Sequence, residues 1–330
     1  MAGSAFRAAL SARRLLFVAG GSSAGRAPVA AAAALALARH GETLLVDADD
    51  PAHGMGDVLG TGLLSTETAA VALPSGSGAA SGSRLSAVRL SRSETRSLLE
   101  EVLATNAWRR LIEQDAGSRM AASIGIPIHE LLGVLDCVRP PPGVEMPVAL
   151  ARQLETAQAS HVVVDAGAAA LAAQLQLVPP ALAGGLDGFL KVQRLVASAK
   201  QAVVPSAVAS GLSLLVGKEV RDGASAQFKE TLARVQELHE AAAALARAQK
   251  GVLLVLPRHP GAAGARAACR LIESLQPLCI ALTGVSDKAV SEAERPDWLP
   301  PGPAVVNLAW EGERPSGIDE LSRLADAMSE

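Results

Sequence analysis

A loop rich in glycine and serine lies near the amino terminus, between an apolar run and a segment rich in alanine. The stretch reads FVAGGSSAGRAPVAAAAALALA over residues 17–38. A glycine-rich loop between a strand and a helix holds phosphate groups with its backbone N–H groups and with the amino end of the helix. The candidate nucleotide-binding positions are therefore the nine residues of this loop: Gly20, Gly21, Ser22, Ser23, Ala24, Gly25, Arg26, Ala27 and Pro28.

The same loop lacks groups that ATP hydrolysis requires. A phosphate-binding loop carries a Lys that neutralises the β- and γ-phosphates, followed by a Ser or Thr whose hydroxyl binds magnesium. Arg26 and Ala27 stand at these two positions. A guanidinium does not replace an ammonium conservatively, and Pro28 removes a backbone N–H from the start of the helix. The sequence therefore assigns no cofactor: it predicts at most weak binding of ATP or ADP, and no magnesium.

A second motif follows the next apolar run. Asp50-Pro51-Ala52-His53 and Asp57 match the pattern D-P-A-H-x-x-x-D. Together with the loop, this segment resembles the arsenite-pump and tail-anchored-protein-targeting ATPase family, where it forms switch I. Asp165, at the end of the run HVVVD, resembles the acid of switch II.

The resemblance covers most of the chain in the right order, although identity is low outside residues 50–57. It implies switch residues at Asp50, His53, Asp57 and Asp165, with Asp50 orienting the attacking water. The residues alone leave other roles open: Asp50 in hydrogen bonding within its loop, His53 in packing, and Asp165 as the cap of the next helix, which is the role we expect.

Because the loop has lost its lysines and its hydroxyl, the resemblance implies a pseudo-ATPase. We expect a non-hydrolysing binding or regulatory partner in membrane-protein targeting or client handling, which binds an active paralogue or a hydrophobic client. A slow but active ATPase of the same family is the first alternative. Whether the protein is an enzyme stays open, with no catalytic residue assigned.

A nonclassical NAD(P)-binding Rossmann protein is the second alternative. Gly21, Gly25 and Ala27 approximate the glycine pattern of a dinucleotide-binding loop, and Asp47 ends the second apolar run, where an acid would bind a ribose hydroxyl. The chain contains no Tyr, which excludes the chemistry of the short-chain dehydrogenases.

These residues can form one site only if the fold places the ends of their strands at the same edge of a sheet. Apolar runs near residues 15–20, 43–48, 161–166, 251–257, 278–284 and 304–310 alternate with helical segments. Such runs are typical of strands buried on both faces, so we expect an α/β fold with a doubly wound, mostly parallel sheet. A single domain over residues 1–330 is predicted, with helical insertions at about 84–158 and 186–248 and a flexible Gly/Ser/Ala linker at 73–83.

Composition narrows the class of partner. A formal net charge of −3 gives no electrostatic footprint for nucleic acid, and Arg84, Arg89, Arg92 and Arg96 are interpreted as a solvated helix face. The uncharged stretch at residues 201–217 is too short for a membrane span; it is a partner contact or plain core. Three separated cysteines form no zinc clasp, so we expect a cytoplasmic protein with weak or no homodimerisation.

Overall fold

The computed structural model describes residues 8–21, 24–48, 54–62, 64–73, 84–91, 93, 95–97, 145–167, 233, 236–237, 239–240, 242–285, 296–310 and 314–329. The chain divides into two compact units. The first comprises Met1–Ser91, Gln153–Leu177 and Arg247–Glu330, and the second Arg92–Arg152 and Val178–Ala246. Every strand described below, and the candidate site, belong to the first unit.

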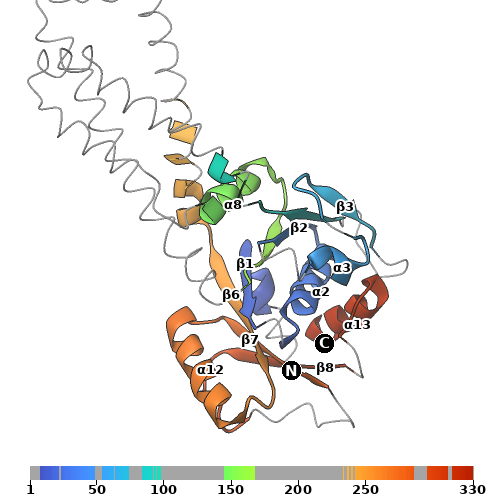
Figure 1. Cartoon of the computed structure of the whole chain (residues 1–330), viewed down its shortest axis with the longest axis vertical. Helices are drawn as coiled ribbons and strands as arrows, with labels where there is room; N and C mark the ends of the chain where they lie inside the picture. The colour runs from blue at the N-terminus through green and yellow to red at the C-terminus, as the bar shows by residue number, and fades with distance from the viewer. Residues whose placement is uncertain are drawn as a thin grey trace, which may run out of the picture. The chain divides into compact units, whose positions relative to one another are not determined.

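The first unit is built on an eight-stranded sheet in the order β3-β4-β2-β5-β1-β6-β7-β8 (Figure 1). Within the described residues, all neighbouring strands pair in parallel except β3 with β4. The fold is therefore the predicted α/β class with a doubly wound, mostly parallel sheet. The strands are β1 (Leu15–Gly20), β2 (Glu42–Asp47), β3 (Ala69–Val71), β4 (Arg84–Arg89), β5 (His161–Asp165), β6 (Lys250–Pro257), β7 (Cys279–Val285) and β8 (Ala304–Trp310).

The apolar runs explain six of these strands. Each predicted run forms one strand, namely β1, β2, β5, β6, β7 and β8. In β1 all six residues are buried, because β5 and β6 flank it and the sheet is covered on both faces. A central parallel strand must be apolar on both sides, which is why the pattern is continuous rather than alternating.

Strand β4 corrects the prediction for residues 84–89. The sequence placed them at the start of a helical insertion, with Arg84 and Arg89 on a helix face, but they pair with β2 in the sheet. Leu85 and Ala87 are buried in the core, whereas Arg84 is exposed at the strand's start. Short apolar side chains between two arginines hide the strand in the sequence. Most of the predicted linker and both insertions, including Arg92, lie outside the described residues.

Helix α2 (Arg26–Ala38) is buried on nearly all sides, as its alanine-rich sequence requires. One face packs on the sheet, and α13 (Ile318–Ser329) packs against it on the other side, as seen in Figure 1. Short alanine side chains let α2 fit between these two layers. Arg39 at the end of α2 forms an ion pair with Asp326 of α13, at 2.5 Å.

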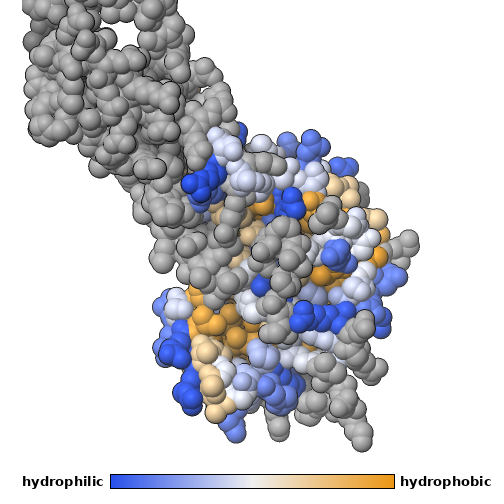
Figure 2. All heavy atoms as spheres, viewed as in Figure 1, coloured by the Kyte–Doolittle hydropathy of each residue, from blue (hydrophilic) through white to orange (hydrophobic). Residues whose placement is uncertain are grey.

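Three further helices accompany α2 and α13 in the described residues. They are α3 (Met55–Leu59), α8 (Glu145–Thr156) and α12 (Gly261–Leu275). The buried residues of α12 are Ala268, Ile272 and Leu275, and none belongs to the core cluster that surrounds α2. We infer that α12 covers the second face of the sheet. In Figure 2 the described surface mixes hydrophilic and hydrophobic residues, and one group of hydrophobic atoms lies beside α12.

Among the described residues, no helix combines the length and the apolar character needed to cross a membrane.

Candidate functional site

The topology brings three strand ends together. Because β5 lies between β2 and β1, the carboxyl ends of these parallel strands meet at one edge, with Asp47, Asp165 and Gly20 as their last residues. Asp47 and Asp165 are register partners. The helix that follows β1 begins at Arg26, directly after the loop. This edge of an open α/β sheet, where the strand order reverses about β1, is the usual position of ligand sites.

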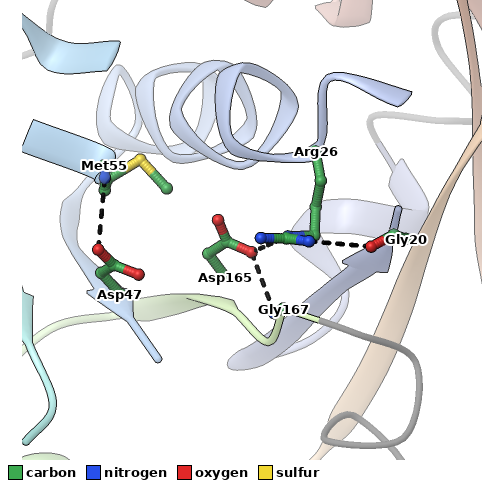
Figure 3. Close-up of polar contacts among 6 residues, drawn as sticks. All are labelled: Gly20, Arg26, Asp47, Met55, Asp165 and Gly167. Carbon is green, nitrogen blue, oxygen red and sulfur yellow. Dashed lines mark hydrogen bonds and ion pairs between the residues drawn. The ribbon is translucent and has the colours of Figure 1, made fainter. Parts of the chain in front are cut away.

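Arg26 reaches across this edge instead of pointing outward. Its Nε donates to Oδ1 of Asp165 at 2.5 Å, and its Nη1 donates to the carbonyl oxygen of Gly20 at 2.9 Å (Figure 3). The two side chains of the ion pair are only 3% and 2% exposed. The guanidinium therefore fills the space between the ends of β1 and β5.

Asp165 is held in an environment that disfavours its charge. The pKa of this carboxyl is raised from 3.8 to about 6: burial raises it most, the Arg26 guanidinium lowers it, and the neighbouring Asp47 carboxylate raises it. The backbone N–H of Gly167 also donates to Oδ1, at 3.2 Å. Desolvation is the largest of these effects, so the pKa of Asp165 stays above its usual value even though the ion pair with Arg26 lowers it.

Asp47 is buried beside this pair, at 3% exposure. Its Oδ2 accepts a hydrogen bond from the backbone N–H of Met55, the first residue of α3, at 3.3 Å (Figure 3). A carboxylate at a helix start is favoured by the helix dipole. Asp47 thus positions α3 beside the loop.

A small pocket lies where α2, α3 and the segment before α13 meet. It has a volume of about 240 Å³ and is lined by Arg26, Ala27, Pro28, Gly54, Asp57, Val58, Arg314, Pro315 and Ser316. Asp57 thus lines the same pocket as the loop positions Arg26–Pro28. Arg314 and Ser316, which adjoin them, were not singled out from the sequence.

Two residues from the other half of the sheet hold the loop. The hydroxyl of Thr283, in β7, donates to the carbonyl oxygen of Ala24 at 2.6 Å. The indole of Trp310, at the end of β8, lies against Gly25: a Cβ on Gly25 would be 2.5 Å from its Cη2 atom. Gly25 also has a φ of 72°, so a glycine is required there for both reasons.

Gly20 is constrained in the same way. Its φ is 155°, and a Cβ there would lie 2.4 Å from the carbonyl oxygen of Val255 in β6. The chain can leave β1 at this angle only with glycine. Sequence reasoning predicted glycines here for close approach to phosphate, whereas the described contacts are with the protein itself.

Four predicted site residues lie outside the described residues: Ser22, Ser23, Asp50 and His53. Gly21 is exposed, and its carbonyl oxygen accepts a hydrogen bond from Ala24 N–H at 3.0 Å. The helix that Asp165 was expected to cap also falls outside, beyond Gly167. Within the described residues, Asp165 accepts hydrogen bonds from Arg26, 139 positions away in the sequence, and from the backbone N–H of Gly167.

The described residues of the site do not fit a magnesium nucleotide. Ala27 has no side-chain oxygen for a metal, and the guanidinium of Arg26 is bonded to Asp165 and to the carbonyl oxygen of Gly20. Pro28 offers no N–H, and the N–H of Ala24 is already bonded within the loop. In the part of the chain that the structure describes, no group of three His, Cys, Asp or Glu side chains is placed to hold a metal ion.

A comparison with models of known protein families finds no match to this chain, and a comparison with curated proteins finds none either.

Proposed function

We propose that this protein is a degenerate relative of the arsenite-pump and tail-anchored-protein-targeting ATPases and acts as a non-hydrolysing binding or regulatory partner in membrane-protein targeting or client handling. The observation that carries the proposal is the inward position of Arg26. The residue that replaces the loop lysine is bonded to Asp165 and to Gly20, so its charge is engaged within the protein. A loop whose cation is engaged internally has lost the group that would neutralise phosphates.

The alternatives are less well supported. A slow ATPase would need Arg26 to leave a buried ion pair and would still lack a magnesium ligand at position 27. A Rossmann-type NAD site would need the carboxylate of Asp47 to face a ribose, but Asp47 is buried and bonded to Met55 N–H. Calorimetry with NAD and with ADP separates the two classes of nucleotide site.

The first test is catalytic. Purified protein should release no phosphate from ATP above the uncatalysed background, with or without magnesium, because positions 26 and 27 cannot supply the charge and the metal ligand. Steady-state phosphate release measures this. Magnesium-dependent turnover that disappears on Asp50→Asn would contradict the proposal and favour the active ATPase.

The second test concerns association. We expect the protein alone to be monomeric or weakly self-associating, since it has neither a Cys-x-x-Cys zinc clasp nor a functional γ-phosphate site to hold two copies together. It should associate more strongly with an intact family member or a hydrophobic client. Light scattering with and without chelator and ATP provides the measurement. A stable homodimer that dissociates when zinc is removed would be evidence against this family relationship.

A further inference from the structure

The loop between β1 and α2 is contacted from three separate strands of the sheet. Asp165 of β5 bonds to Arg26, Thr283 of β7 bonds to Ala24, and Trp310 of β8 lies against Gly25. These strands come from positions that are far apart in the sequence. Three independent contacts on three consecutive residues leave the described part of the loop little freedom to move.

The contacts are also of kinds that persist without a ligand. The ion pair is almost completely buried, and Thr283 is 2% exposed. Breaking the ion pair would separate two buried opposite charges, and breaking the Thr283 bond would take a donor from the carbonyl oxygen of the buried Ala24; both changes are costly. Ala24 itself is 3% exposed. Residues 24–26 are thus packed as part of the core.

We propose that Arg26, Thr283 and Trp310 form a latch that holds this loop in one conformation without any ligand. The latch makes the pocket between the start of α2, α3 and the segment before α13 independent of nucleotide. This inference rests on the proposed function and specifies its regulation: the protein presents a constant surface to its partner, whereas an active relative would change with its nucleotide state.

Hydrogen–deuterium exchange on the full chain tests the latch. In the wild type, exchange of the backbone amides of residues 24–27, 29 and 30 should be unchanged by millimolar ADP or ATP. In Arg26→Met these amides should exchange about tenfold faster or more. A tenfold change in exchange rate corresponds to about 1.4 kcal/mol, and a hydrogen bond to a charged group contributes at least that much. Amides of β1 and β6 in the same sample report any global loss of stability.

Arg39→Met is the matched control. It removes an ion pair from the other end of the same helix, and it should leave exchange of the same amides as in the wild type. If Arg26→Met does not fold, Thr283→Val and Trp310→Ala each remove one contact with the loop without leaving a buried charge unpaired; Thr283→Val also removes the bond of the hydroxyl to the carbonyl oxygen of Leu256. Each should accelerate loop exchange by a smaller factor.

Two results would overturn the latch. One is slower loop exchange in the wild type when ADP or ATP is added. The other is loop exchange at the wild-type rate in both single variants Thr283→Val and Trp310→Ala and, where it folds, in the single variant Arg26→Met. These results are distinct from failure of the proposed function. Magnesium-dependent ATP turnover overturns the function, whereas a loop that no substitution loosens overturns the latch alone.

Discussion

Replacing Arg26 by Met is expected to lower the free energy of unfolding by about 3–5 kcal/mol at pH 8, which is the usual effect of removing one partner from a buried ion pair. Methionine keeps much of the side-chain volume but removes the charge. The carboxylate of Asp165 would then be buried beside Asp47 without its guanidinium. Urea denaturation of the wild type and the variant measures the difference.

Two further variants separate charge from packing. Adding Asp165→Asn to Arg26→Met should recover stability, because the strand end then carries no ionised group facing the lost guanidinium. Arg39→Met should cost less than about 1 kcal/mol, since its partner Asp326 is half exposed and surface pairs contribute little. Equal losses in Arg26→Met and Arg39→Met would show that the buried pair has no special role in stability.

The second large effect is a dependence of stability on pH. The pKa of Asp165 is raised from 3.8 to about 6 in the folded protein. The folded state therefore binds this proton more tightly than the unfolded chain does. The resulting stabilisation is fully present below about pH 4 and is lost as the pH rises through 6. A shift of this size corresponds to about 3 kcal/mol in full, of which about 2 kcal/mol lies between pH 4.5 and 8.

Other groups also titrate in this range, so the measurement must be a difference. The free energy of unfolding is determined by urea titration at several pH values for the wild type and for Asp165→Asn. Relative to the variant, the wild type should lose about 2 kcal/mol on going from pH 4.5 to 8. If the free energies of unfolding of the two proteins changed in parallel with pH, or if the wild type became relatively more stable at pH 8, the pKa of Asp165 would not be raised by folding.

The sequence was sufficient for the central part of the fold. Strands such as β1 and β5 are continuous apolar runs because both of their faces are covered, and that pattern is visible without a structure. Strand β4 was missed because its ends are arginines, and β3 has only three residues, two of them exposed. An edge of the sheet need not be apolar, so composition does not mark it.

The candidate site was predicted as a set of positions but not as a set of contacts. Arg26 and Asp165 were both identified, yet the sequence does not show that they bind each other across 139 residues. The sequence did contain one indication. In a parallel sheet, the helix after one strand begins near the end of the neighbouring strand, and the charges of Arg26 and Asp165 are opposite. Trp310 carried no such signal, since its contact with Gly25 depends on β8 being three strands away from β1.

The position of β5 between β1 and β2 also has a consequence for how the chain folds. The first two strands are separated by one helix, but they do not pair with each other; each pairs with β5, which begins at residue 161. The centre of the sheet therefore cannot close until more than a hundred further residues have been synthesised. Until then the backbone N–H and C=O groups of β1 and β2 that pair with β5 remain unpaired, and closing a loop of this length slows folding. A nascent chain arrested before β5 should accordingly need a chaperone to protect its first βαβ segment.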